Sequence, residues 1–281
     1  MIKLLSGKEY KEYNLRTDFG NKFDFGRAGF VCGSIFYQGA AAFSVSAALH
    51  TGLGLAVAFI PECIYNAFSS KISGAVIEPL KCKDGMICDS ELAMKIYNRK
   101  CNAVLCGSGL GISSQSAFTV SMIAQTDLDV VFDADALSII AKDKSLFDRK
   151  GNTVITPHIA EFARLTDLTV DYVRKNRIKL ATEFSMKYNC IVVLKDYVTV
   201  IADVKGNAYV LSNPTSALSK AGSGDVLAGM IVSFIAQGYK PVQACKIATT
   251  LHNACGHKCS KIYGSAFTQP ENLIDSVSGL I

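Results

Sequence analysis

Residues 219–229, Ser-Lys-Ala-Gly-Ser-Gly-Asp-Val-Leu-Ala-Gly, join a turn of small residues to a carboxylate at the start of an apolar helical pattern. At such a turn, exposed backbone N–H groups and the positive end of a helix bind anions, phosphates above all. Asp225 would then lie beside the bound anion and could act as a base. The alternative stays open that Gly222 and Gly224 only shape a turn and that Asp225 only caps a helix.

The rest of the chain predicts elements that place this turn at one edge of a sheet. Short apolar runs alternate with longer helical patterns, which is typical of a mostly parallel sheet with helices on both faces. We expect strands at 29–33, 53–60, 75–78, 102–106, 129–133, 153–156, 190–194, 199–203 and 208–211. We expect helices at 40–50, 113–124, 171–188, 225–237 and 241–259. The turn at 205–207 predicts an antiparallel hairpin between the last two strands.

Small or polar residues follow several of these strands, where ligands bind in open α/β sheets. Such residues stand at 33–34 and 39–41, 107–111, 133–136, 156–161 and 195–199. Asp133 and Asp135 could hold a metal, orient a substrate or cap the next helix. Thr156 and Glu161 could form the two ends of a helix-starting cap. Lys195 is placed like a phosphate partner, although a solvated Lys is common at a strand end.

The composition of the 281 residues, 49% hydrophobic and 19% charged, is typical of a well-packed globule and favours one domain. A net charge of +5 is too diffuse to indicate nucleic acid as a partner but is compatible with anionic small molecules. The longest apolar stretches, 53–61 and 226–236, are too short to span a membrane, and residues 1–8 lack the apolar core of a secretory signal. We therefore expect a cytoplasmic protein without a membrane partner.

The ten cysteines lie mostly in apolar contexts, which indicates buried, reduced thiols rather than a disulfide framework. His252, Cys255, His257 and Cys259 bring four potential zinc ligands into eight residues. On a helix His252, Cys255 and Cys259 would share a face, whereas structural zinc sites draw their ligands from two separated pairs. The spacing favours helical packing, and the sequence identifies no ligand set for a metal.

Taken in order, these segments resemble the ADP/ATP-dependent NAD(P)H-hydrate dehydratases of the ribokinase-like superfamily, over nearly the whole chain. The Gly-Ser-Gly-Asp segment is shared with many ribokinase-like kinases, and its combination with Thr156-Pro157-His158 and Arg164-Leu165 is more specific to the dehydratases. The resemblance implies a single ribokinase-like domain over 1–281. This α/β fold has a central, mostly parallel sheet flanked by helices on both faces and an antiparallel hairpin near the nucleotide site.

The resemblance also implies ADP- or ATP-dependent dehydration, with Mg²⁺, of NADHX and NADPHX, the forms of NADH and NADPH hydrated at C6 of the reduced ring. Asp225 would take the proton of the 6-hydroxyl while the terminal phosphoryl group is transferred to it, and loss of phosphate would restore the ring. The hydrate site would include Ala40, Gly111, His158 and Asp225. The nucleotide would be held by Lys195, Asp196, Tyr197, Val198, Thr199, Gly222, Ser223 and Gly224. Family members suggest a homotetramer, and the choice between ADP and ATP stays open.

The chain departs from the family pattern at several positions. The family usually has Lys-Gly at the nucleotide turn, whereas Asp196 follows Lys195 here, and a carboxylate near phosphates is unfavourable unless it faces away or holds a cation. Residues 21–27 stand where members show His-Lys-Gly, Ser108 replaces a usual Pro, and Ala160 replaces a usual Gly. Each change removes a special backbone residue or a polar side chain from the expected site.

Three other functions are compatible with parts of the sequence. A kinase of hydroxymethylpyrimidine, hydroxyethylthiazole or pyridoxal would use the same turn and the same carboxylate but keep the phosphorylated product. A non-catalytic member would bind a nucleotide or cofactor without turnover, as the departures at Asn21 and Asp196 suggest. A dinucleotide-binding dehydrogenase is disfavoured because the glycines at 107–111 lack the spacing of that motif.

Overall fold

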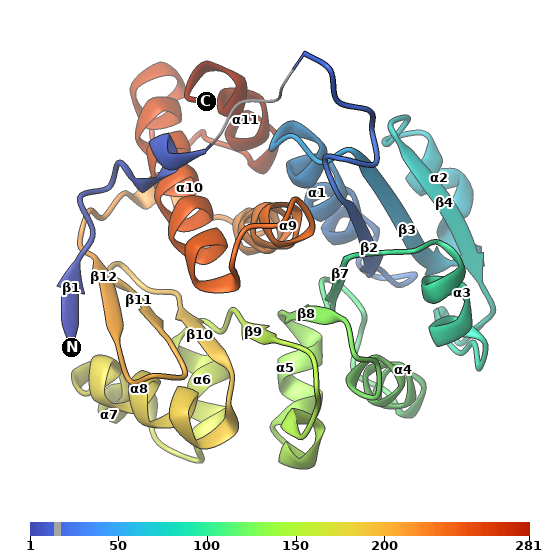
Figure 1. The fold of residues 1–281 in the computed structure, drawn as a ribbon, viewed down its shortest axis with the longest axis horizontal. Coiled ribbons are helices and arrows are strands. Elements are labelled where there is room, and N and C mark those ends of the chain that lie inside the picture. Colours follow the sequence, from blue (N-terminus) through green and yellow to red (C-terminus); the bar gives the residue numbers. More distant parts are fainter. Residues whose placement is uncertain (14–17) are drawn as a thin grey trace.

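The computed structural model of the chain describes residues 1–13 and 18–281 and contains a large sheet between two layers of helices (Figure 1). Within these residues, ten strands form the sheet in the order β1-β12-β11-β10-β9-β8-β7-β2-β3-β4. Their bounds are β1 Ile2–Leu4, β2 Arg27–Val31, β3 Leu55–Pro61, β4 Ala75–Leu80, β7 Ala103–Cys106, β8 Asp129–Phe132, β9 Thr153–Ile155, β10 Ile191–Leu194, β11 Thr199–Ala202 and β12 Ala208–Leu211. A separate antiparallel hairpin consists of β5 Cys82–Lys83 and β6 Met86–Ile87.

Helices cover both faces of the sheet (Figure 1). One face carries α1 Gln38–His50, α2 Tyr65–Ser69, α9 Ser223–Ala236, α10 Pro241–Tyr263 and α11 Pro270–Asp275. The other carries α3 Leu92–Asn98, α4 Ser114–Ala124, α5 Asp135–Ile140, α6 Ile159–Thr166, α7 Val170–Lys175 and α8 Arg177–Tyr188. Short 3-10 helices are η1 Glu9–Glu12, η2 Glu62–Ile64, η3 Lys144–Phe147, η4 Ser216–Leu218 and η5 Ser276–Gly279.

Alternating side chains of the central strands pack into the two hydrophobic cores. Along β3, Ala56, Ala58 and Ile60 pack into the core beneath α1 and α9, whereas Val57 and Phe59 pack into the core on the opposite face. Successive side chains of a strand point to opposite faces, so a strand covered on both sides has an almost continuous apolar sequence. This is why such strands are recognisable from their apolar runs.

The expected fold class is confirmed. All nine expected strands are present with ends shifted by two residues or fewer, and neighbouring strands of the large sheet are parallel except where β11 pairs with β10 and β12. The expected hairpin joins β11 to β12. Its turn is stabilised by Asp203, whose Oδ1 accepts hydrogen bonds from the backbone N–H groups of Lys205 at 3.0 Å and Asn207 at 2.9 Å.

The expectation of one helix over 171–188 is wrong, because the segment forms α7 and α8 with a break at Asn176. The Asn176 side chain donates from Nδ2 to the carbonyl oxygen of Tyr172 at 2.9 Å, and its backbone has φ −115° and ψ 20°. Side chains of Asn compete in this way with helical backbone hydrogen bonds. The strand β1, the β5–β6 hairpin and the short helices α2, α3 and α11 were not expected from the sequence, and α5 and α6 were expected only as possible helix starts.

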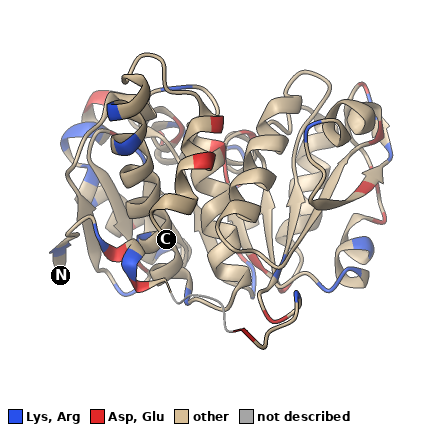
Figure 2. Ribbon diagram, turned by 90° about the horizontal axis from the view of Figure 1, so that it is seen from above, with Lys and Arg blue, Asp and Glu red and all other residues tan. Residues whose placement is uncertain are grey.

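Helix α9 lies centrally and packs closely against α1 (Figure 1). A Cβ on Gly229 of α9 would come within 2.2 Å of the Ser44 carbonyl oxygen of α1, so only glycine permits this approach. Lys and Arg are spread around the outline of the molecule and intermixed with Asp and Glu (Figure 2). Within residues 1–13 and 18–281, no helix combines the length and apolar character that crossing a membrane requires.

Candidate active site

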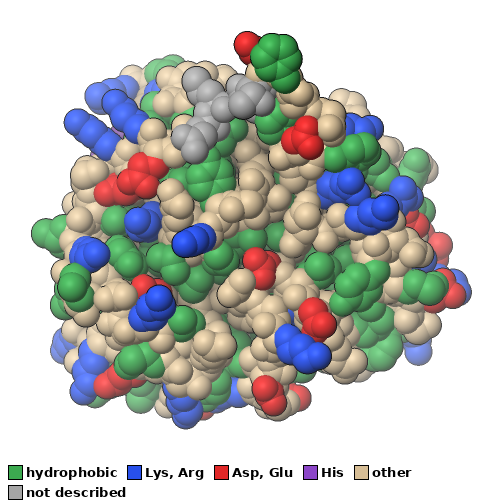
Figure 3. Space-filling model, viewed as in Figure 1, with side chains coloured by type: hydrophobic (Ala, Val, Ile, Leu, Met, Phe, Trp, Pro, Cys, Tyr) green, Lys and Arg blue, Asp and Glu red, His purple; other side chains and the backbone are tan. Residues whose placement is uncertain are grey.

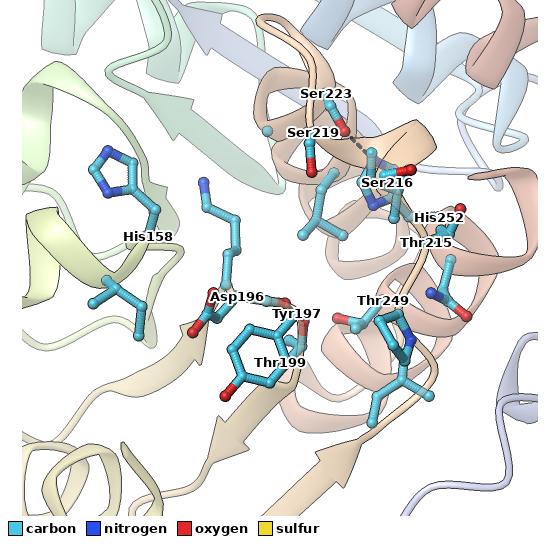
Figure 4. Close-up of a pocket in the computed structure, with 18 of the residues that line it drawn as sticks. His158, Asp196, Tyr197, Thr199, Thr215, Ser216, Ser219, Ser223, Thr249 and His252 are labelled. Carbon is cyan, nitrogen blue, oxygen red and sulfur yellow. Dashed lines mark hydrogen bonds between the residues drawn. The ribbon is translucent and has the colours of Figure 1, made fainter. Parts of the chain in front are cut away.

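A pocket of about 720 Å³ opens where the carboxyl ends of β9 and β10 face α9 and α10 (Figure 4). The face of the molecule seen in Figure 3 is hollowed near its middle. Six of the residues expected to hold a nucleotide line the pocket: Lys195, Asp196, Tyr197, Thr199, Ser223 and Gly224. Val198 and Gly222 lie outside its lining, as do Ala40, Gly111 and Asp225 of the expected hydrate site. His158, also expected at the hydrate site, does line it.

The turn before α9 depends on Gly222, which precedes the helix with a left-handed φ of 92°. A Cβ at this position would also come within 2.8 Å of the Phe43 side chain. No side chain caps α9, and Asp225 lies in its first turn, so the alternative that Asp225 only caps the helix is wrong. The first N–H groups of a helix lack partners within the helix, and the start of α9 therefore supplies hydrogen-bond donors for an anion.

The Asp225 carboxyl group is half-buried among other acids. Burial, followed by repulsion from Asp133, raises its pKa to about 7, although a hydrogen bond from Ser108 and the nearby charge of Lys195 act in the opposite direction. A carboxyl group with this pKa exchanges a proton readily near neutral pH, as general base catalysis requires. Perturbed carboxyl groups of this kind are concentrated at functional sites.

Lys195 is held over the start of α9 rather than solvated. Its Nζ donates a hydrogen bond to Oδ1 of the buried Asp133 at 3.0 Å and lies 3.1 Å from the place that a Cβ of Gly224 would take. Asp133 also accepts hydrogen bonds from Thr156 Oγ1 at 2.6 Å and from Ser108 Oγ at 3.4 Å. Burial, the largest single effect, would lower the pKa of Lys195, but the combined charges of Asp133, Glu161 and Asp225 outweigh it and the pKa is raised. Lys195 therefore keeps its positive charge beside the anion-binding turn.

The start of α6 carries a cap, but Thr156 is not part of it, contrary to expectation. His158 and Glu161 form the cap. His158 Nδ1 accepts hydrogen bonds from the backbone N–H groups of Ala160 at 3.1 Å and Glu161 at 3.2 Å, and Glu161 Oε2 accepts from the backbone N–H of His158. Since α6 begins at Ile159, the cap must stand directly before it, and Thr156 is left to bond Asp133. Neutral His158 consequently carries its proton on Nε2.

Asp196 is turned toward two arginines that the sequence analysis did not single out. Its Oδ2 lies 3.5 Å from Arg174 Nε and 3.7 Å from an Arg177 nitrogen, so its charge is compensated. Arg177 also stacks on the Tyr197 ring and donates to its hydroxyl at 2.9 Å. The arginines flank the break between α7 and α8, and only the fold brings them to the nucleotide turn.

The far wall of the pocket comes from residues 213–219, which include η4, and from α10, neither of which was expected at a site. Its polar residues are Asn213, Thr215, Ser216, Ser219, Thr249, His252 and Asn253. The expected packing of His252, Cys255 and Cys259 is confirmed, since all three are buried. His252 has a further contact, because its Nε2 lies 3.1 Å from Ser223 Oγ, and burial lowers its pKa to about 4. His252 is therefore neutral at neutral pH.

The strand ends beside this pocket converge on Asp225 from the other side. The Gly111 backbone N–H donates to Asp135 Oδ2 at 2.8 Å, and burial raises the pKa of Asp135. A Cβ on Gly109 would come within 2.8 Å of the Ala40 Cβ, which places Ala40 against the same loop. Neither Asp133 nor Asp135 caps α5, since no side chain bonds its N-cap. In the described parts of the chain, no His, Cys, Asp and Glu side chains cluster as a metal site would require.

Of the departures from the family pattern, residues 21–27 lie away from the site, contrary to expectation. They lead into the amino end of β2, whose first residue is Arg27, and a Cβ on Gly26 would come within 2.2 Å of the Ala236 carbonyl oxygen at the last turn of α9. Ser108 and Ala160 do lie at the site, where they hydrogen-bond to Asp133 and His158. The departures that bear on chemistry are therefore those at Ser108, Ala160 and Asp196.

A sequence model of the NAD(P)H-hydrate dehydratases matches residues 28–278. The chain belongs to this family. It is 33% identical over 254 residues to a bifunctional NAD(P)H-hydrate repair enzyme Nnr of Dictyoglomus turgidum, a match covering 89% of this chain and 49% of that protein. It is 30% identical over 258 residues to an ADP-dependent (S)-NAD(P)H-hydrate dehydratase of Neisseria meningitidis, covering 90% of this chain and 84% of that one.

A solved structure of the ADP/ATP-dependent NAD(P)H-hydrate dehydratase of Bacillus subtilis, co-crystallised with ATP/Mg²⁺, superposes with a TM-score of 0.86. The two sequences are 25% identical, and the superposition covers 99% of this chain and 97% of that one. The resemblance noted in the sequence is therefore confirmed at the level of the family. The chain spans about half the length of the bifunctional relatives that it matches.

Proposed function

We propose that this chain, as one domain over 1–281, dehydrates NADHX and NADPHX at the expense of ADP or ATP. The observation that carries the proposal is Asp225, a carboxyl group with a pKa near 7 in the first turn of α9, next to the Lys195 ammonium group. One side of this pair faces a pocket large enough for a nucleotide, and the other faces the loops at Gly111 and Asp135. Family membership supports the choice of substrates.

In the proposed reaction Asp225 takes the proton of the 6-hydroxyl group. The hydroxyl oxygen attacks the terminal phosphorus of the nucleotide at the same time. Lys195 and the N–H groups at the start of α9 would offset the charge on the transferred phosphoryl group. The C6–O bond then breaks, phosphate leaves, and a proton lost from C5 restores the ring double bond. A hydroxyl group is a poor leaving group, whereas phosphate is a good one, which is why the nucleotide is consumed.

Magnesium would enter with the nucleotide phosphates, which together with water are its usual ligands in such sites. The described side chains form no cluster suited to hold the ion by themselves, and Asp133 is already engaged by Lys195 and Thr156. We therefore assign no protein ligand to magnesium. The cytoplasmic location and the homotetramer expected from the sequence stay predictions.

The proposal is tested by adding ADP or ATP with MgCl₂ to hydrated NADPH and following the absorbance of the reduced nicotinamide. We expect the absorbance to recover, with one nucleotide favoured over the other, while mass spectrometry detects equimolar phosphate and spent nucleotide. A stable phosphorylated product without recovery would instead show a small-molecule kinase. Nucleotide binding by calorimetry without any product would show a non-catalytic member.

A further inference from the structure

Two cysteines stand side by side at the carboxyl ends of β3 and β4. These strands are parallel, and their last paired residues are Pro61 and Leu80. Cys63 lies two residues beyond Pro61, in η2, and Cys82 lies two residues beyond Leu80, in β5. Neighbouring strands run about 4.8 Å apart, and a disulfide needs Cα atoms about 4.4–6.8 Å apart. Equal offsets from one register pair leave both residues next to each other at the same edge of the sheet.

The side chains meet as the backbone register suggests. Partial desolvation and a hydrogen bond with the Cys82 thiol raise the pKa of Cys63 to about 11. Both groups are accessible, because Cys63 is exposed and Cys82 is only half-buried. Among the other cysteines only Cys88 is exposed, and the rest are buried. An oxidant in solution would thus encounter these thiols before the seven in the core.

Cys82 belongs to the β5–β6 hairpin, which contacts the segments after β2 and β7, next to Asp225. The Gly85 carbonyl oxygen accepts a hydrogen bond from the Ile35 backbone N–H at 3.0 Å. The Met86 side chain lies 3.5 Å from the place that a Cβ of Gly111 would take. A covalent bond at Cys82 would therefore fix one end of a hairpin that covers the Gly111 loop.

We propose that Cys63 and Cys82 form a reversible disulfide that ties the 82–87 hairpin to the end of β3. With hydrogen peroxide as oxidant, one cysteine sulfur attacks a peroxide oxygen, the O–O bond breaks, and water leaves with the thiol proton, giving a sulfenic acid. The second sulfur attacks the sulfenic sulfur, the S–S bond forms, the S–O bond breaks, and a second water leaves with the thiol proton. Two thiols are oxidised and one peroxide is reduced, and a dithiol reductant reverses the change.

The test is to treat the whole protein with hydrogen peroxide, block the remaining thiols and map peptides without reduction. We expect a Cys63–Cys82 cross-linked peptide that dithiothreitol removes. Cys88→Ser should leave that peptide unchanged, whereas Cys63→Ser and Cys82→Ser should each abolish it. Hydrogen exchange of the amides of 82–88 should slow at least threefold on oxidation and recover on reduction.

A disulfide between Cys82 and Cys88, or over-oxidised single cysteines with no cross-link, would overturn the proposal, as would unchanged exchange in the cross-linked protein. These measurements need no substrate, so they stand apart from the assay of the dehydratase reaction. One expectation rests on the proposed function: oxidation should change the KM for hydrated NADPH at least threefold and leave the KM for the nucleotide unchanged, and Cys63→Ser should remove this response.

Discussion

Lys195 donates a hydrogen bond from Nζ to Asp133 Oδ1 at 3.0 Å, and the same nitrogen lies against Gly224. One buried carboxylate thereby fixes a cation above the helix start that is proposed to receive phosphate. The charge of Asp133 also acts on Asp225: after burial, it is the largest cause of the raised pKa of Asp225. The ion pair and the proposed base are therefore electrostatically linked, so a substitution in the ion pair should change the pKa of Asp225.

The first prediction concerns Asp225 itself. Asp225→Asn keeps the size of the side chain but removes the proton acceptor, so kcat for hydrated NADPH should fall by about 10²–10⁴-fold. Affinity for the nucleotide, measured by calorimetry, should change little because Lys195 and the helix start remain. Turnover within tenfold of the unaltered protein would show that Asp225 is not the base.

The second prediction is the pH dependence of that base. The ionised carboxylate is the active form, so kcat/KM should rise with pH and level off above a midpoint of about 7. Asp133→Asn removes the repulsion that raises this pKa, and the midpoint should move down by about one pH unit. Asp129→Asn, at the opposite end of the same strand, is the matched control and should leave the midpoint in place. An unmoved midpoint in Asp133→Asn would contradict the electrostatic link.

The third prediction is that Asp225→Asn, which should abolish activity, raises the free energy of unfolding at neutral and alkaline pH. Burial and Asp133 raise the pKa of Asp225 from 3.8 to about 7 in the folded chain, so ionisation between these values opposes folding. The folded state of the unaltered protein should therefore lose stability as the pH rises from 4 to 7, relative to Asp225→Asn. At pH 8 the variant should have the higher free energy of unfolding, by up to roughly 4 kcal/mol. Urea titrations at pH 4 and pH 8 measure the difference, and equal stability at both would argue against a buried, repelled carboxylate.

The fourth prediction separates two glycines of one helix. Gly224→Ala would place a methyl group 3.1 Å from Lys195 Nζ, at the position we assign to the phosphoryl group, so the KM for the nucleotide should rise about tenfold. The fold should survive, because the new contact is the end of a flexible side chain. Gly229→Ala, whose Cβ would meet the Ser44 carbonyl oxygen at 2.2 Å, should instead lower the melting temperature by several degrees. The reverse pattern would show that position 224 serves packing and not binding.

The sequence predicted those parts of the fold and site that are continuous along the chain. The central strands stood out because burial on both faces makes them largely apolar, whereas β1 has three exposed residues and α2, α3, α5 and α11 have seven residues or fewer. The nucleotide turn at 195–199 and the turn before α9 were found because each is a short motif.

The missing half of the pocket depends on tertiary structure. Thr249, His252 and Asn253 lie on α10, and only the packing of α10 beside α9 turns that face toward the pocket. Arg174 reaches Asp196 because α7 ends near the nucleotide turn. Likewise, the choice of His158 over Thr156 as the cap follows from where α6 begins, which a sequence places only within a few residues.

The fifth prediction concerns Asp196, where this chain departs from its family. Its carboxylate is paired with Arg174 and Arg177, and both Asp196 and Arg174 line the pocket, so it competes with phosphate for the Arg174 guanidinium group. Asp196→Asn should free the arginines and lower the KM for ADP or ATP by about three- to tenfold, most strongly at low salt. Asp171→Asn, which removes a highly exposed partner 3.8 Å from Arg174, is the matched control and should change the KM little. A higher KM in Asp196→Asn would mean that Asp196 positions the arginines for the nucleotide, and Arg174→Ala should then weaken binding by as much.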